Sequence, residues 1–223
     1  MSLEIKNLTF SYKGRRGQKP VKVLDNFSAS FEFGRITALI GDNGSGKTTL
    51  AKLIMGIMCS DSGSHCTFLD GESIDDWSLA QRGRAIGYVM QNPAKQIFCE
   101  TVLEEVKYGL LNQGLDNMVA ETVARGYIEK FGLTHHIEDM PFNLSHGEKQ
   151  RLVLAAILAM KPRYLILDEP TASLDEKHKL VLGDMLQDIA RPNRSCDGCG
   201  IIVISHDKKF IEKYCDGEVA INA

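Results

Sequence analysis

The sequence has no long hydrophobic run, no strong excess of charge and no signal peptide, and each absence excludes a class of protein. No stretch approaches the roughly 20 consecutive apolar residues that a membrane-spanning helix needs. The formal net charge of −3 argues against a protein whose main partner is nucleic acid. The N-terminal MSLEIKNLTF alternates as a β-strand does and is therefore not expected to be a signal peptide. Without a secretory signal, the six cysteines are expected to be cytosolic thiols.

Only one pair of cysteines is close enough in sequence to suggest a site, namely Cys196 and Cys199 in CDGC. A single C-x-x-C without a second pair or a nearby histidine is more often an incidental loop feature than a zinc or redox site. Repeats and low-complexity segments are also absent from the sequence. The length of 223 residues allows one large α/β domain, or one core with an inserted lobe.

The hydrophobic patterns predict a single domain, 1–223, built from two kinds of sheet. LEIKNLTFSY and KVLDNFSASFEF alternate as half-buried antiparallel strands do, whereas RITALIG, AIGYVMQ, YLILDEP and GIIVISH are apolar runs typical of buried parallel strands. No strand is predicted from about Thr101 to Met160. We therefore predict a core with its β subdomain at 1–90 and 161–223, and a loop with a helical subdomain at about 91–160.

The stretch QNPAKQIFCE, residues 91–100, predicts a shaped loop that leads into a helix. Pro93 prevents a helix from starting earlier, and Thr101 with Glu104 predicts a capping box at the start of the next helix. If the two lobes rotate when nucleotide binds, this loop is the expected hinge. The alternative is a rigid connector in which Gln96 only caps or packs.

The motif GDNGSGKTT follows a predicted buried strand and precedes a predicted helix. It fits G-x-x-x-x-G-K-[ST], a loop whose glycines let successive N–H groups face one phosphate chain. Lys47 would reach the β- and γ-phosphates, and the Thr48 hydroxyl is placed for Mg²⁺. The predicted nucleotide-binding residues of this loop are Gly41, Asp42, Asn43, Gly44, Ser45, Gly46, Lys47, Thr48 and Thr49.

Two carboxylates follow the strand YLIL, at the end where ligands bind in open α/β sheets. Asp168 would hold Mg²⁺ directly or through water. Glu169 is one residue further along and so points differently, toward an attacking water. A carboxylate beside the metal ligand favours hydrolysis over transfer to a hydroxyl acceptor.

NLSHGEKQR begins an apolar helix, and Ser145 with Glu148 predicts a second capping box. A cap alone does not explain Gly147, which lowers helix propensity by ~1 kcal/mol relative to alanine. Glycine permits close approach by another group, and a helix N-terminus favours an anion. A cap and a phosphate contact are compatible.

Together GDNGSGKTT, Gln91, LSHGEKQR, YLILDEP, SLD and ISH resemble the motifs of ATP-binding cassette (ABC) ATPases, over nearly the entire chain. The resemblance implies an α/β P-loop NTPase core with a mainly parallel sheet, an N-terminal antiparallel β subdomain and an inserted α-helical subdomain. It also implies ATP and Mg²⁺. In this family Tyr12 would stack on adenine, Gln91 would touch Mg²⁺ and the attacking water, Glu169 would be the general base, and His206 would contact the γ-phosphate.

The resemblance further implies a head-to-tail pair of cassettes, as a homodimer or a heterodimer. Ser145 and Gly147 of one subunit would close on ATP held by the other, with Asp175 at the seam. The usual family sequence is Leu-Ser-Gly-Gly-Gln, so His146 and Glu148 are departures. His146 would add a titratable contact near phosphate or point outward.

QNPAKQIFCETVLEEVKYGL is similar to the corresponding stretch of energy-coupling-factor ATPases, which power uptake of vitamins or of cobalt or nickel ions. In those proteins a second glutamine, here Gln96, shapes a helix that faces the membrane component. The implied partner is an integral membrane transporter component, and the implied place is the cytoplasmic face of the cell membrane, as a peripheral subunit. No nucleic-acid partner is expected.

Three alternatives remain: a non-transport cassette acting on DNA or ribosomes, the ATPase of another ABC transporter class, and a nucleotide-binding regulator without a motor role. The chain stops at EVAINA, just after the expected core, and without the extra C-terminal segment that many energy-coupling-factor ATPases carry. We therefore expect the isolated chain to be mostly monomeric without ATP.

Overall fold

A computed structural model describes residues 1–13, 19–60, 66–172, 174–191 and 198–221. Cys196 of the CDGC pair, Ser173 of the SLD motif and most of the basic loop KGRRGQKP lie outside these ranges.

The N-terminal part forms the expected antiparallel sheet. Its strand order is β2-β1-β4-β5, with β1 (Ser2–Tyr12), β2 (Val21–Glu32), β4 (Thr67–Leu69) and β5 (Glu72–Ser73). The alternation in the first two strands buries one face of each, as Leu3 and Ile5 show. β4 and β5 were not predicted, because two or three residues are too few to show a pattern.

The second sheet is wholly parallel, and its order is β6-β7-β8-β3-β9. Its strands are β3 (Ile36–Ile40), β6 (Ile86–Val89), β7 (Tyr164–Asp168), β8 (Gly200–Ile204) and β9 (Gly217–Ala220). The four apolar runs therefore form neighbouring strands, as predicted. β9 corrects the expectation that EVAINA follows the core, because residues 217–220 pair with β3 as an edge strand of this sheet.

Alternation along the parallel strands divides the buried side chains between two cores. Ile201 and Val203 pack with the helical region, whereas Ile202 and Ile204 pack against the antiparallel sheet. Because these strands are buried on both faces, their sequences are nearly continuous apolar runs.

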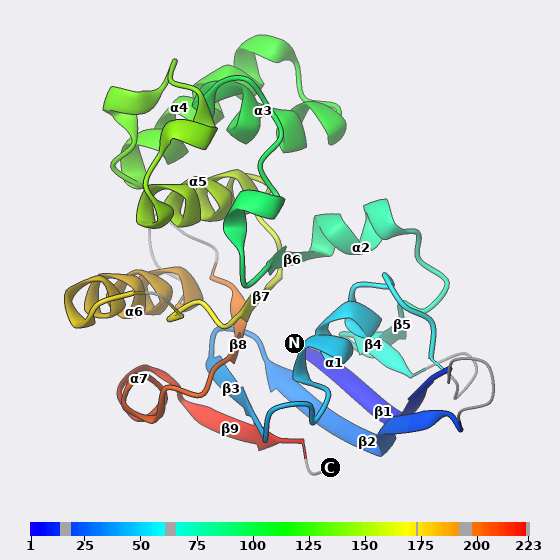
Figure 1. The fold of residues 1–223 in the computed structure, drawn as a ribbon. Coiled ribbons are helices and arrows are strands. Elements are labelled where there is room, and N and C mark those ends of the chain that lie inside the picture. The colour runs from blue at the N-terminus through cyan, green and yellow to red at the C-terminus, as the bar shows by residue number, and fades with distance from the viewer. Residues whose placement is uncertain (14–18, 61–65, 173, 192–197, 222–223) are drawn as a thin grey trace.

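Seven α-helices occur in the described residues: α1 (Lys47–Ile54), α2 (Leu79–Ala85), α3 (Val102–Asn112), α4 (Asn117–Lys130), α5 (His146–Ala159), α6 (Glu176–Ala190) and α7 (Lys208–Tyr214). α3, α4 and α5 gather at one end of the molecule, on the far side from the antiparallel sheet (Figure 1). Thr101 caps α3 by accepting a hydrogen bond from the N–H of Glu104 at 3.1 Å, which is one half of the expected capping box. Within the described ranges, no helix is long and apolar enough to cross a membrane.

Candidate nucleotide-binding and hydrolysis site

The GDNGSGKTT loop joins β3 to α1, and the helix begins at Lys47 as predicted. Gly46 precedes it with φ of 103°, a conformation that L residues rarely adopt. A Cβ on Gly46 would lie 2.5 Å from Cγ1 of Val23, so the loop lies directly against β2. The Ser45 hydroxyl is buried in this loop and has no hydrogen-bond partner among the described residues.

The loop meets the end of β7 through charged and hydroxyl groups. The buried ammonium of Lys47 donates to the carbonyls of Gly41 at 2.7 Å and Asp42 at 3.0 Å. The Thr48 hydroxyl donates to the two carboxylate oxygens of Asp168 at 2.9 and 3.2 Å. Parallel strands and the loops after them therefore bring two distant motifs to one edge of the sheet.

Glu169 follows in a left-handed backbone conformation, with φ of 50°. Such backbone strain in a residue other than glycine often occurs at functional sites. Its carboxylate Oε1 lies 3.4 Å from Nε2 of His206, at the end of the neighbouring strand β8. Burial raises the pKa of Glu169, while the charge of His206 opposes that rise. A carboxylate with a raised pKa beside an imidazole is suited to accept a proton.

These groups border one cleft of about 460 Å³, here named the P-loop cleft after the phosphate-binding loop at residues 41–49. Its lining includes Tyr12, Asn43, Gly44, Gly46, Lys47, Thr48, Thr49, Gln91, Asp168, Glu169 and His206. The hydroxyl of Tyr12 is 2.9 Å from Oγ1 of Thr49, which holds the half-exposed ring at the mouth of the cleft. Most of the predicted catalytic and P-loop residues are thus brought together.

The oxygen groups in this cleft suit Mg²⁺. The Thr48 hydroxyl, the Asp168 carboxylate and the Gln91 amide are hard donors, and Mg²⁺ in proteins is usually held by few such groups together with substrate phosphates. Across the described ranges, no group of three or more histidine, cysteine or acidic side chains suggests another metal centre.

A second cleft of about 450 Å³, here named the Ser145 cleft, contains Ser145, Gly147 and Asp175. It shares no lining residue with the P-loop cleft. The capping box is present in full: Ser145 N–H donates to Oε2 of Glu148 at 2.8 Å, and Glu148 N–H donates to the Ser145 hydroxyl at 3.4 Å. The Ser145 hydroxyl also donates to Oε2 of Glu148 at 2.7 Å, and this bond, together with the one from the Ser145 N–H, lowers the pKa of the Glu148 carboxyl. A Cβ on Gly147 would have no atom within 4 Å, so packing within the chain does not require glycine there.

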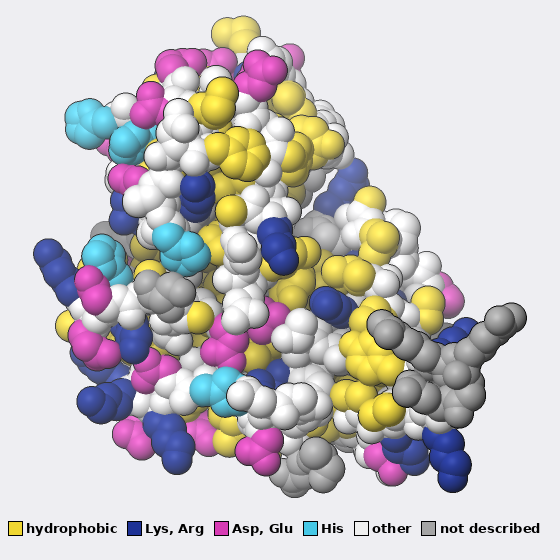
Figure 2. Space-filling view, viewed as in Figure 1, with side chains coloured by type: hydrophobic (Ala, Val, Ile, Leu, Met, Phe, Trp, Pro, Cys, Tyr) yellow, Lys and Arg dark blue, Asp and Glu magenta, His cyan; other side chains and the backbone are white. Residues whose placement is uncertain are grey.

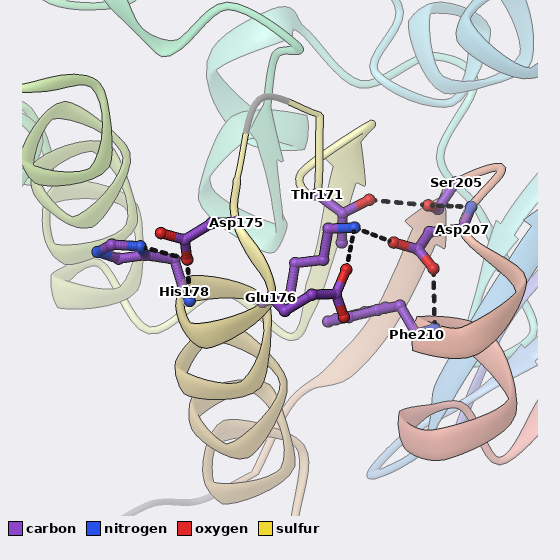
Figure 3. A network of polar contacts seen from close by, with 8 residues as sticks. Thr171, Asp175, Glu176, His178, Ser205, Asp207 and Phe210 are labelled. Atoms are coloured by element: carbon purple, nitrogen blue, oxygen red, sulfur yellow. Dashed lines mark hydrogen bonds and ion pairs between the residues drawn. The ribbon is translucent and has the colours of Figure 1, made fainter.

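A polar network joins the segment that follows Glu169 to the segment around His206 (Figure 3). The hydroxyls of Thr171 and Ser205 are 3.1 Å apart. The ammonium of Lys179, in the first turn of α6, lies 2.6 Å from Oδ2 of Asp207. Oδ1 of Asp207 in turn caps α7 by accepting from the N–H of Phe210 at 3.1 Å. The residue after His206 is thus tied to α6, the helix that Asp175 caps.

The loop 91–100 is held from both ends. The Gln96 amide accepts from Met90 N–H at 2.7 Å and donates to the Tyr88 carbonyl at 2.8 Å, so this side chain points inward. The buried Glu105 on α3 accepts from the N–H groups of Phe98 at 3.0 Å and of Cys99 at 2.8 Å.

The sequence patterns did not identify Tyr88 or Glu105. The alternation of residues along β6 predicts which face of the sheet the Tyr88 side chain occupies. It does not predict that this side chain lies opposite Asp168. A glutamate close to a predicted N-cap is also common on helix surfaces, so Glu105 gave no signal of its burial.

Comparison with known proteins agrees with this geometry. The family model described as ABC transporter matches residues 24–172. This chain belongs to the ABC transporter family. A predicted ABC transporter ATP-binding protein of Pyrococcus furiosus is 39% identical over 214 residues, covering 96% of this chain and 77% of that protein. The energy-coupling factor transporter ATP-binding protein EcfA of Methanosphaera stadtmanae is 37% identical, covering 96% of this chain and 73% of its own length.

Solved structures of ABC transporter proteins have the same fold. CbiO1 of Clostridium perfringens, part of the ABC transporter complex cbiONQ, superposes with a TM-score of 0.84 at 28% identity, over 99% of this chain and 84% of its own. A dimeric bacterial ABC transporter cassette superposes with a TM-score of 0.83 at 25% identity, over 98% of this chain and 94% of its own. This ABC cassette is therefore an ATP-binding subunit of an ABC transporter that hydrolyses ATP.

Proposed function

We propose that this ABC cassette powers an energy-coupling-factor-type importer of a vitamin or of cobalt or nickel ions, from the cytoplasmic face of the membrane. The likeness to CbiO1 and to the Methanosphaera EcfA supports this subtype. The hydrogen bonds of Gln96 support it as well, because the resemblance implies that this glutamine shapes the segment leading to the helix that faces the membrane component.

The observation that carries the proposed mechanism, in which two cassettes close on ATP, is the separation of the two clefts. Lys47, Thr48 and Glu169 border one, and Ser145 and Gly147 border the other, with no residue in common. One chain therefore cannot surround ATP with both sets of groups. Two copies, or this chain and a related cassette, can place the Ser145 cleft of one against the P-loop cleft of the other. ATP then links the two subunits, and its hydrolysis separates them.

Within each closed cleft the side chains have distinct roles in the proposed hydrolysis. Lys47 and the P-loop N–H groups stabilise negative charge on the phosphates, and Tyr12 stacks on adenine. Thr48, Asp168 and Gln91 would hold Mg²⁺, which screens the phosphate charge when bound. Glu169 accepts a proton from the attacking water, and His206 contacts the γ-phosphate.

The membrane component is proposed to dock on the helical region. Hydrophobic side chains are exposed over the upper part of the molecule in the view of Figure 2. Two aromatic side chains at the loop 91–100 and on α3 are exposed, Phe98 to 60% and Tyr108 to 49%. Their rings pack edge to face, with centroids 4.8 Å apart. Exposed aromatic residues of this kind are common anchors in interfaces. Glu105 fixes the backbone at Phe98, so a movement of α3 would carry this surface with it.

The test is reconstitution of this cassette in liposomes with candidate integral membrane components of energy-coupling-factor importers. We expect ATP-dependent uptake of a vitamin or of cobalt or nickel, and loss of assembly when Phe98 and Tyr108 are both replaced by alanine. Uptake of an unrelated solute would indicate another transporter class. ATP turnover stimulated by nucleic acid with a steep salt dependence, or no turnover even with the membrane proteins, would overturn the proposal.

A further inference from the structure

The hydroxyl of Tyr88 serves no purpose in packing the core. Tyr88 lies on β6, is 7% exposed and packs in the core beneath the antiparallel sheet, where phenylalanine would fill the same space. Burying a hydroxyl costs free energy unless it is hydrogen-bonded. Here it donates to Oδ2 of Asp168 on the neighbouring strand β7 at 3.1 Å.

That oxygen also accepts from the Thr48 hydroxyl at 2.9 Å. Two hydroxyls, from β6 and from the start of α1, therefore meet on one carboxylate oxygen. In this bond the phenolic O–H of Tyr88 donates and the carboxylate oxygen accepts. Together the two donors fix the rotation of the Asp168 side chain.

The backbone of Tyr88 is held by the loop that carries Gln91. Its carbonyl accepts from Nε2 of Gln96 at 2.8 Å, and the other end of that amide accepts from Met90, the residue before Gln91. Tyr88 thus connects Gln96 to Asp168, because its backbone carbonyl is hydrogen-bonded to Gln96 and its side-chain hydroxyl to Asp168.

We infer that Tyr88 is a positioning residue for the metal-binding carboxylate, one that links the loop 91–100 to the Mg²⁺ site through its hydroxyl. The inference rests on the proposed role of Asp168 as a Mg²⁺ ligand. Partners of metal ligands typically contribute about 10–100-fold to metal affinity or activity, because they orient the ligand. Movement of the loop would then change how Asp168 is presented to the metal.

Tyr88→Phe removes this hydroxyl and keeps the ring. Tyr164→Phe is the matched control, because Tyr164 is also buried, lies on the adjacent strand β7 and donates to the carbonyl of Phe31 at 3.2 Å, away from the cleft. The measurements are binding of a fluorescent ATP analogue over a Mg²⁺ titration, the same binding in EDTA, and thermal unfolding.

We expect Tyr88→Phe to raise the half-saturating Mg²⁺ concentration about tenfold, with binding in EDTA unchanged. Tyr164→Phe should leave the Mg²⁺ titration as in the wild type, while both variants lose a similar, small amount of thermal stability. An unchanged titration for Tyr88→Phe, or an equal change in both variants, would overturn the inference. Asp168→Asn distinguishes failure of the inference about Tyr88 from failure of the proposed metal site. If Asp168→Asn too leaves the Mg²⁺ titration unchanged, the proposed metal site itself is wrong.

Discussion

The P-loop cleft and the Ser145 cleft depend on their own chain in opposite ways. In the P-loop cleft, Gly46 has a positive φ and would meet Val23 if it carried a Cβ. In the Ser145 cleft, Gly147 has open space around the position of a Cβ. The first glycine is required by the fold of this ABC cassette, and the second is not.

The difference teaches where each half of the proposed site is completed. The groups around Lys47 and Asp168 are already bonded to one another, so their positions are set within one subunit. Ser145 and Gly147 present a helix N-terminus outward, where only a group from outside the chain can use it. Substitutions at matched positions can therefore separate nucleotide binding from subunit closure.

The largest effect is expected when both clefts stay intact and only the base is lost. Glu169→Gln keeps the shape of the side chain but cannot accept the proton, so hydrolysis should fall by about 10²–10⁴-fold. Mg-ATP binding should persist, and an ATP-dependent dimer should accumulate in light scattering. Wild-type turnover in this variant would show that another group is the base.

Gly46→Ala should damage the P-loop cleft itself. The strained φ of 103° and the contact with Val23 should destabilise the fold by about 1–3 kcal/mol. ATP affinity should fall strongly, because the N–H groups around the phosphates shift. Chemical denaturation and nucleotide titration measure the two effects; unchanged affinity would mean that the loop adapts.

Gly147→Ala should leave ATP binding by the isolated chain unchanged but weaken the ATP-dependent dimer and its hydrolysis severalfold. Stability should remain or rise by up to ~1 kcal/mol, because alanine is the better helix former. Sedimentation in the Glu169→Gln background measures the dimer.

Gly126→Ala is the matched control for Gly147→Ala. Gly126 is an exposed residue within α4, and a Cβ at this position would also have no atom within 4 Å. It should gain the same helix propensity with no effect on the dimer. If both variants dimerise like the parent, the surface around Gly147 is not the seam.

The smallest effect is expected in the network that joins the two segments of the P-loop cleft. Lys179→Met should reduce kcat modestly and leave ATP affinity unchanged. The reason is that Asp207, the residue next to His206, would lose the ion pair that holds it to α6. Lys179→Arg should restore kcat. The exposed Lys177→Met on the same helix is the control, and an equal loss there would remove the specific role of Lys179.

The same pair predicts a dependence of stability on pH. Lys179 lowers the pKa of Asp207 below its ordinary value of 3.8, so the carboxylate stabilises the fold above that value and loses this contribution as pH falls through the lowered pKa. The stability difference between wild type and Lys179→Met should therefore shrink in acid. Thermal unfolding between neutral pH and pH values below 3.8 measures the trend.

Much of the site could be predicted because its motifs are local. The P-loop needs glycines, lysine and threonine at fixed spacing between a strand and a helix, and these are consecutive residues. The placement of Asp168 beside Thr48 could also be expected, since parallel strands end at one edge of the sheet. β9 could not, because four residues near the end of the chain form a strand only when β3 offers them an edge.

The sequence by itself determined the ABC cassette motifs, the two capping boxes as possibilities, and the buried parallel strands, because each depends on neighbours within a few residues. Only the tertiary structure decided that Gln96 points inward, that Glu105 is buried beneath the loop, and that the hydroxyl of Tyr88 meets Asp168. Those contacts join residues on different strands and helices, and a hydrogen bond depends on distances of a few tenths of an ångström. Packing of the whole chain sets such distances, whereas periodicity along the sequence sets only which face a side chain occupies.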